Sequence, residues 1–236
     1  METYRRVLLK ISGEVLGGTE SLDGKALDTI CDDIITLAQQ RVEIALVVGG
    51  GNIFRGIVGV EKGVDRVMGD YMGMLATLIN GIALVDTLRK KGAKVAIQSS
   101  IPIEGVVQHI DIEAAKALLE SGTIVVFAGG TGLPFFSTDS NAALRAAEIH
   151  ADILLKATKV DGVYDKDPKK FPDAKKFQKL SYDEAINKNL KVMDSTAFSL
   201  CRDNKIPLLV FKLEKGTIPT VLQNMARYTL LSDFFS

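Results

Sequence analysis

Two glycine-bearing segments of the sequence have residue types that bind anions. "KISGE" places Lys10 at the end of an apolar run and Ser12 and Gly13 in the turn after it, and "GGGNIFRG" places three glycines and then Arg55 after the next run. A lysine at a strand end can reach an anionic group while a glycine N–H approaches it closely. We expect a helix to begin near Asn52, where free N–H groups favour anions, and Arg55 adds a bidentate contact to a phosphate. The pattern predicts phosphate chemistry, although it matches neither the Walker A nor the G-x-G-x-x-G spacing.

Each of these segments also has a purely structural interpretation. Lys10 could be a solvated lysine beside an ordinary turn, and the three glycines could only relieve crowding between a strand and a helix. The two interpretations stay open for each segment taken alone.

A third segment, "GGTGLPFFSTD", again places glycines after an apolar run. Ser137, Thr138 and Asp139 then precede an alanine-rich helical pattern, and such residues commonly cap helices. Capping and ligand binding can coexist in one loop. We expect Phe135 and Phe136 to be core residues rather than platforms for a base.

Two further features are candidates for nucleotide contacts. Asp70 interrupts an apolar helical pattern between two glycines, and a buried lone carboxylate is costly. It therefore either faces water or binds something specific, such as paired sugar hydroxyls. "KATKVDGVYDKDP" brings Thr158, Asp161, Tyr164 and Asp167 together, but it is also typical of a turn.

The sequence lacks the usual sets for other chemistry. His109 and His150 are isolated, and no Ser-His-Asp set, H-E-x-x-H motif or paired cysteines occur. The polar loops offer hydrogen-bond donors and positive charge but no obvious general base. This set suits phosphoryl transfer, whose catalysis is mostly positioning and charge neutralisation. A phosphate monoester, with a second pKa of about 6, is largely a dianion at neutral pH and needs no base as an acceptor.

The elements that position these residues alternate along the chain. Apolar runs typical of buried parallel strands cover 6–11, 43–48, 94–98, 123–128, 152–157 and 207–211. Helical spacing falls between them, with Gly122 expected to end one helix and "SYDE" to begin another through a capping box. The sequence therefore predicts a single α/β domain over 1–236 with a mainly parallel sheet, whose ligands bind at the carboxyl ends of its strands.

Composition excludes several classes of function. Lys plus Arg and Asp plus Glu are both 29, and this zero net charge argues against broad binding to nucleic acid. Cys31 and Cys201 fit no metal or redox spacing, so we expect a reduced, cytosolic chain. No secretory signal and no membrane span is expected.

Six motifs together resemble the bacterial UMP kinases, a branch of the amino acid kinase superfamily. The motifs are "LLKISGE", "VVGGGNIFRG", "GDYMGMLATLINGIAL", "GGTGLPFFSTDS", "LLKATKVDGVYDKDP" and "VMDSTAF". They occur in order from about residue 5 to about residue 225, and the third and fifth are the most specific to this branch. The resemblance implies a three-layer αβα sandwich and the reaction of UMP with ATP and Mg²⁺ to give UDP and ADP. It also implies a cytosolic homohexamer acting in pyrimidine nucleotide synthesis.

The resemblance also assigns roles to matching residues. Lys10, Arg55 and Asp139 are the expected catalytic residues, and no protein ligand of the metal is assigned. The expected ATP site comprises Lys10, Ile11, Ser12, Gly13, Gly51, Arg55, Thr158, Tyr164 and Asp167. The expected UMP site comprises Gly50, Asp70, Thr131, Gly132, Leu133, Pro134, Phe135, Phe136, Ser137 and Thr138.

The chain departs from the family pattern in places that affect specificity and regulation. Leu133 replaces an asparagine of the UMP loop, and Ser137 replaces a threonine. Some members are inhibited by UTP and activated by GTP, and the GTP site uses a helix aspartate, which Asp86 matches, with arginines near the positions of Ala96 and Thr123. Because those arginines are absent, we do not expect GTP activation, although Arg89 supplies some charge.

Two other functions compete with this one. A relative that phosphorylates a carboxylate, such as that of acetylglutamate or aspartate, is disfavoured because Asp70 would repel an anionic acceptor. A non-catalytic nucleotide- or oxyanion-binding protein on the same fold is opposed by the presence of both Lys10 and Arg55.

Overall fold

A computed structural model of the chain describes residues 4–17, 21–55, 63–190, 192–223 and 228–233. The strands in chain order are β1 (Arg6–Ile11), β2 (Glu43–Val48), β3 (Val95–Ser99), β4 (Gln108–His109), β5 (Ile124–Ala128), β6 (Ile153–Thr158), β7 (Val163–Tyr164), β8 (Lys176–Phe177), β9 (Lys179–Leu180), β10 (Leu208–Lys212) and β11 (Tyr228–Leu231). The helices are η1 (Gly13–Val15), α1 (Gly24–Ala38), α3 (Arg66–Lys90), α4 (Ile112–Glu120), α5 (Thr138–Glu148), α6 (Tyr182–Asn187), α7 (Ser195–Asp203) and η2 (Ile218–Thr220).

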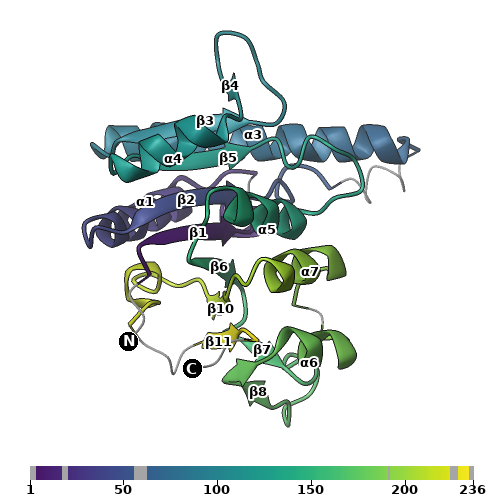
Figure 1. Cartoon of the computed structure of the whole chain (residues 1–236). Coiled ribbons are helices and arrows are strands. Elements are labelled where there is room, and N and C mark those ends of the chain that lie inside the picture. Colours follow the sequence, from purple (N-terminus) through teal and green to yellow (C-terminus); the bar gives the residue numbers. More distant parts are fainter. Residues whose placement is uncertain (1–3, 18–20, 56–62, 191, 224–227, 234–236) are drawn as a thin grey trace.

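Nine of these strands form one sheet in the order β4-β3-β5-β2-β1-β6-β10-β11-β9 (Figure 1). Every pairing is parallel except that of β10 with β11. The six apolar runs correspond to β1, β2, β3, β5, β6 and β10, so the prediction of a mainly parallel sheet is confirmed.

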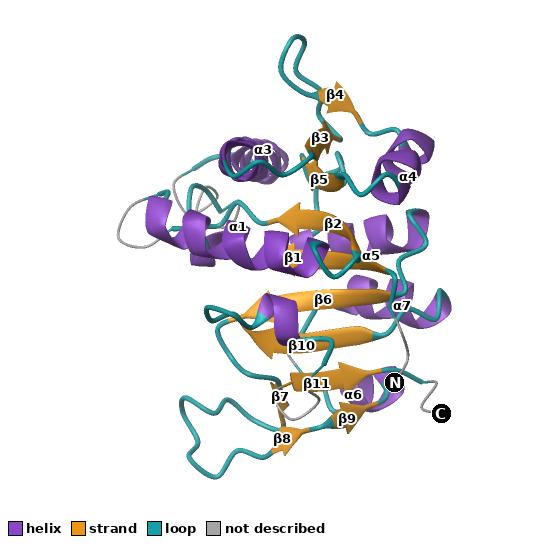
Figure 2. Ribbon diagram, turned by 90° about the vertical axis from the view of Figure 1, so that its left-hand side faces the viewer, coloured by secondary structure: helices purple, strands orange, loops and turns teal. Residues whose placement is uncertain are grey.

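Helices cover both faces of the sheet (Figure 2). On one face α1 and α3 contribute apolar side chains to a core that includes Leu9 and Leu46. On the other face α4, α5, α6 and α7 pack on a second core that includes Leu8 and Leu154. Because neighbouring residues of a strand point to opposite faces, each buried strand serves both cores. The predicted three-layer αβα sandwich is confirmed.

The helix ends follow the sequence signals. Ser181 and Glu184 form the predicted capping box at the start of α6. Gly122 follows α4 with a positive φ of 76°, a backbone conformation in which glycine is unstrained.

Helix α3 carries an exposed apolar stripe. Its helical spacing was predicted, but the repeating residues face outward: Met68, Met72, Leu75, Ile79 and Ile82. By length and composition α3 could also cross a membrane, although half of its most apolar window is buried in the molecule. A core helix of a water-soluble protein meets the same criteria, so this is weak support for a membrane span.

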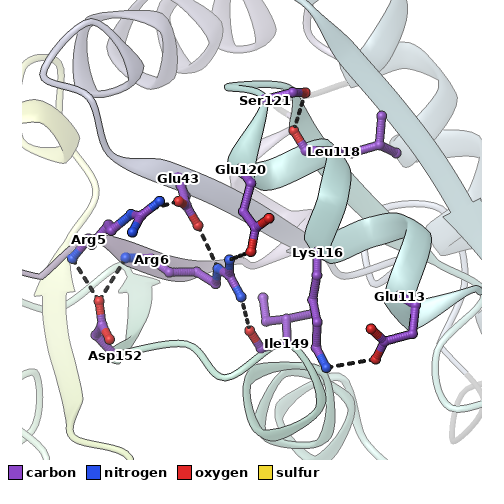
Figure 3. Close-up of polar contacts among 10 residues, drawn as sticks. All are labelled: Arg5, Arg6, Glu43, Glu113, Lys116, Leu118, Glu120, Ser121, Ile149 and Asp152. Atoms are coloured by element: carbon purple, nitrogen blue, oxygen red, sulfur yellow. Dashed lines mark hydrogen bonds and ion pairs between the residues drawn. The ribbon is translucent and has the colours of Figure 1, made fainter.

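The amino ends of the central strands are held by ion pairs (Figure 3). Arg6 Nε donates to Glu43 Oε2 at 2.6 Å, and Arg5 Nε lies 2.9 Å from the other oxygen of the same carboxylate. The backbone N–H groups of Arg5 and Arg6 donate to Asp152, immediately before β6, at 2.7 and 2.8 Å. Arg6 also pairs with Glu120 at the end of α4. The cluster joins β1 to both neighbouring strands at the edge opposite the polar loops.

Candidate active site

The polar loops predicted from the sequence meet at one edge of the sheet. Since β1 lies between β2 and β6, and β5 lies beyond β2, the turns after these four strands are adjacent. Helix α5 begins at the same edge, and its first N–H groups favour negative charge there.

A carboxylate whose side chain is 17% exposed lies between two lysines at this edge. Lys10 of β1 and Lys156 of β6 are partners in the parallel register, so their side chains leave the same face of the sheet. That face packs against α5, and Asp139 lies in the first turn of α5. Lys156 Nζ donates to Asp139 Oδ2 at 2.6 Å, and Lys10 Nζ lies 3.0 Å from Oδ1 as an ion pair rather than an aligned hydrogen bond.

The two ammonium groups keep this carboxylate ionised. Burial alone would raise the pKa of Asp139, but the charges of Lys156 and Lys10 outweigh it and hold the pKa below its usual range. Burial lowers the pKa of the Lys156 ammonium, and Asp139 opposes that shift. Lys156 also donates to the carbonyl of Val192. The three side chains form a compact group with one net positive charge.

Sequence reasoning missed Lys156. "DILLKA" was interpreted only as a buried strand, although a lysine inside a strand buried on both faces needs a partner. The lysine inside such a run was the available signal, whereas its place opposite Lys10 depends on the register of β1 with β6.

Packing explains the glycines of both anion-binding turns. A Cβ built on Gly13 would lie 2.6 Å from the carbonyl oxygen of Gly49, so the two turns touch backbone to backbone. A Cβ on Gly50 would lie 2.8 Å from the backbone nitrogen of Thr77 in α3. At Gly51 the space is less restricted, since the nearest atom is 3.3 Å away on the flexible Arg55 side chain. A Cβ on Gly49 would likewise lie 2.9 Å from the Gly13 nitrogen, so Gly13, Gly49 and Gly50 each have a structural reason to be glycine that does not require a ligand.

A pair of asparagines fixes the second turn. Asn80 of α3 is fully buried and donates to the Gly49 carbonyl at 2.6 Å and to Asn52 Oδ1 at 2.7 Å. The prediction of a helix beginning near Asn52 is wrong for the described residues: 51–53 form a turn in which the Gly50 carbonyl accepts from the N–H groups of Ile53 and Phe54. Because Asn52 bonds back to Asn80, its side chain serves the turn instead of capping a helix.

Arg55 forms an ion pair with Glu14 in the turn after β1. The other oxygen of Glu14 lies 2.9 Å from Lys159, in the turn after β6. Both cations are more than half exposed, so they remain accessible to a larger anion. This places a positive cluster across the mouth of the three turns.

Asp70 is paired within the chain rather than facing water. Its carboxylate accepts from Arg66 Nε at 3.1 and 3.0 Å and from the backbone N–H of Phe135 at 2.8 Å. The Arg66 guanidinium also lies over the Phe135 ring, 5.5 Å from its centroid. Asp70 thereby connects α3 to the loop after β5.

The loop after β5 is open to solvent. The expectation that Phe135 and Phe136 belong to the core is wrong, since their exposed fractions are 68% and 50%. Phe135 has a φ of 70°, strained for such a side chain and held by the bond to Asp70. Leu133 is also exposed, and its N–H donates to Thr131 Oγ1. Gly132, with a φ of 80°, and Pro134 complete the turn.

The Ser-Thr-Asp sequence begins α5 as a helix cap. Ser137 Oγ accepts from the N–H groups of Asp139 and Ser140 and donates to Asp194, the N-cap of α7. Asp194 also accepts from Ser140 Oγ at 2.9 Å, so one carboxylate joins the starts of α5 and α7. Thr138 Oγ1 lies near Gly49, 3.7 Å from where a Cβ would be. The capping interpretation is correct and leaves Thr138 facing the glycine turns.

A cavity of about 580 Å³ lies on the side of β6, β10 and β11. Tyr164 lines it, and its hydroxyl donates to Asp161 Oδ1 at 2.6 Å. Thr158 and Asp167 are close in sequence to lining residues, but they do not line the cavity. Thr158 Oγ1 donates to the Val160 carbonyl and accepts from the Val160 N–H, and Asp167 accepts from the N–H of Lys169. The side chain of Ile11 is fully buried, so this residue can offer a ligand only backbone atoms.

Asp33, which the sequence analysis did not single out, fixes the segment 214–217 beside this cavity. Glu214 and Thr217 line the cavity, and the N–H of Gly216 between them donates to both oxygens of Asp33, at 2.8 and 3.1 Å. Asp33 lies in α1 and is nearly buried, and burial raises the pKa of its carboxyl.

The fold and the site define a kinase of one family: the sequence profile of the amino acid kinase family matches residues 5–212, and the chain belongs to this family. Within it, the chain belongs with the uridylate kinases. It is 51% identical to the uridylate kinase of Xanthomonas campestris pv. campestris, an alignment that covers 97% of each chain.

Solved structures agree with this assignment. The UMP kinase from Ureaplasma parvum superposes with a TM-score of 0.93 at 38% identity, covering 98% of this chain and 100% of that one. The UMP kinase from Bacillus anthracis superposes with a TM-score of 0.95 at 37% identity, covering 99% and 98%.

Proposed function

We propose that this chain transfers the γ-phosphoryl group of ATP to UMP, giving UDP and ADP for pyrimidine nucleotide synthesis. The observation that carries the proposal is the position of Lys10. It lies at the end of the central strand, between a cavity on the β6–β10 side and an open loop on the β5 side. A phosphoryl group passing between two nucleotides needs a fixed cation at that place.

ATP occupies the cavity side. A volume of about 580 Å³ suits a nucleoside, and Tyr164 with the apolar Val160, Phe211 and Val221 offers a surface for the base. The triphosphate extends over the turn of Ile11, Ser12 and Gly13 toward Gly51. Thr158 and Asp167 remain expected ATP residues, and they would contact the nucleotide after a local rearrangement of their turns.

Arg55 and Lys159 bind the ATP phosphates in exchange for Glu14. A triphosphate carries more negative charge than one carboxylate, and the exposed ion pairs with Glu14 are weak in water. Glu14 therefore neutralises the two cations when no nucleotide is bound.

UMP occupies the β5 side. Gly50 offers its N–H to the UMP phosphate, and Thr138 faces the same turn. Asp70 holds the ribose hydroxyls, and residues 131–137 with the exposed Phe135 and Phe136 surround the uracil. Leu133 offers a backbone contact where the family pattern has an asparagine side chain.

The geometry supplies charge at the point of transfer. Lys10 neutralises the moving phosphoryl group and Asp139 holds the lysine in place. No general base is required, because the UMP phosphate is largely a dianion at neutral pH.

Mg²⁺ is the proposed metal, bound mainly by the nucleotide phosphates. Among the described residues there is no group of three or more His, Cys, Asp or Glu side chains that could hold a metal ion. Mg²⁺ commonly keeps several waters and takes most other ligands from substrate phosphates, so the donor set is compatible with a metal that arrives with ATP.

We propose a cytoplasmic homohexamer in which the exposed stripe of α3 forms a contact between copies. An apolar helix face of this length is unusual on a monomer, and its partner here is a second copy of the same helix. Light scattering after chromatography tests this: Leu75→Asp with Ile79→Asp should lower the molecular mass, and an unchanged mass would exclude this face.

The proposed effector response is inhibition by UTP without activation by GTP. Asp86, the candidate for GTP binding, pairs with Lys90 at 2.6 Å, and Arg89 donates to the Val95 carbonyl. Initial rates with added UTP or GTP test this, and a GTP-dependent increase in rate would refute the second part.

One assay tests the proposed function itself. The protein is incubated with Mg-ATP and, separately, UMP, CMP, dTMP, acetylglutamate or aspartate, and ADP release is followed. Release that depends on UMP alone is the expected result. Release with an amino acid would make the chain a carboxylate kinase, and no release with any acceptor would make it a nucleotide-binding protein.

A further inference from the structure

The buried ammonium of Lys156 has no obvious place in substrate binding. It is on β6, its side chain is only 10% exposed, and its described bonds go to Asp139 and to the Val192 carbonyl. A lysine directly opposite another lysine on a neighbouring strand is unfavourable by itself. Its presence beside Lys10 therefore requires an explanation.

The shared carboxylate provides that explanation. If Lys10 were the sole partner of Asp139, the pair would carry no net charge, and the field that a phosphoryl group meets would be weak. With Lys156 on the second oxygen, the group carries one net positive charge while Asp139 still orients Lys10. Asp194 attracts Lys156 through its charge, but it bonds to Ser137, Ser140 and the N–H of Ala197 and forms no ion pair with a described residue.

We propose that Lys156 is a positioning residue that neutralises Asp139, so that Lys10 presents a full positive charge to the transferring phosphoryl group. This inference rests on the proposed kinase activity. Lys156 acts through Asp139 and does not touch a nucleotide. Its contribution is to turnover rather than to binding, because the charge matters most where negative charge is redistributed in the transition state.

If Lys156 acts through its charge, two variants should differ in a way that a purely structural role of Lys156 does not predict. Lys156→Met removes one positive charge and leaves a neutral Lys10–Asp139 pair. Asp139→Asn combined with Lys156→Met removes one charge of each sign and restores the net charge of the wild type. Removing both members of a buried pair is also milder than leaving one of them alone.

The experiment measures kcat, both KM values and the midpoint of thermal unfolding for the wild type, both single variants and the double variant. Lys116→Met, on the surface of α4 and paired with Glu113, is the matched control. We expect Lys156→Met to lower kcat at least about 30-fold with KM values changed less than about threefold. The double variant should be at least about tenfold faster than Lys156→Met. It should also unfold at a higher temperature than Asp139→Asn, which leaves two unpaired ammonium groups.

Several outcomes would overturn the inference. They are a double variant that is no faster than Lys156→Met, a Lys156→Met protein that fails to fold, and an effect of Lys156→Met confined to KM. If the wild type itself releases no ADP with UMP, the proposed function fails instead, and the two failures are thereby distinguished.

Discussion

Replacing Asp70 by asparagine tests the division of the site into a UMP side and an ATP side. The change keeps the size of the side chain and removes its charge and one of its two acceptor oxygens. In the structure both oxygens are used: Oδ2 accepts from the Phe135 N–H at 2.8 Å, and Arg66 donates to both. In the asparagine the NH₂ group would replace one oxygen, so an N–H donor would face either the Arg66 or the Phe135 N–H.

The size of the effect follows from these contacts. A hydrogen bond to a charged group contributes about 1.5–3 kcal/mol, and a nucleotide ribose in this place would lose one of that kind. The pair with Arg66 exists without UMP and is weak because the arginine side chain is 46% exposed, so its loss adds little to the change in KM. A loss of about 1.5–3 kcal/mol corresponds to a rise of about 10- to 150-fold in the KM for UMP.

Steady-state kinetics with each substrate varied in turn measures this difference. The KM for ATP should change less than about threefold, because the cavity lies on the opposite side of β1. Asp65→Asn is a suitable control, because it makes the same charge change at the N-cap of the same helix, where asparagine caps as well as aspartate. Equal increases in both KM values would show that Asp70 is structural and that the assignment of the two sides is wrong.

Three further predictions concern other parts of the site. Lys10→Ala should lower turnover by about 10²–10³-fold with little change in either KM, and an unchanged kcat would remove Lys10 from the catalytic residues. Gly50→Ala should destabilise the fold by about 1–3 kcal/mol in urea unfolding, because its Cβ would meet the Thr77 backbone at 2.8 Å; an unaltered midpoint would contradict that packing. Asp33, with its pKa raised by burial, binds a proton more readily folded than unfolded, so its contribution to stability falls as pH rises from about 4 through the raised pKa. The unfolding free energy of the wild type minus that of Asp33→Asn should therefore decrease over that range and then level off, whereas a constant difference would contradict the shift.

The regular elements were predictable because their signals are local. The six long strands are continuous apolar runs, and burial on both faces leaves little ambiguity in such a run. The short strands β4 and β7 to β9 have two residues each and no periodicity to detect. Strand β11 lies between β10 and the two-residue β9, and the sequence indicates neither pairing by itself.

The residues of the candidate site were predictable where a local sequence motif marks them. They were not predictable where contacts between distant segments determine their position. Lys10 lies at the end of a strand and the glycine turns directly follow strands, so the sequence indicated both. Lys156 was not indicated, because its position opposite Lys10 depends on the register of β1 with β6. Phe135 was assigned to the core by residue type, but the strained turn and the bond to Asp70 hold it in solvent.

The ion pairs at the amino ends of the strands fix the register of β1, and this register determines where Lys10 points at the carboxyl end. Arg6 and Lys10 lie on the same face of β1, four residues or about 13 Å apart, and Arg6 is tied to Glu43. A slip of β1 by one residue would turn Lys10 toward α1 and away from Asp139. Glu43 and Asp152 therefore help to fix, from the other end of the strand, which side of the sheet receives Lys10.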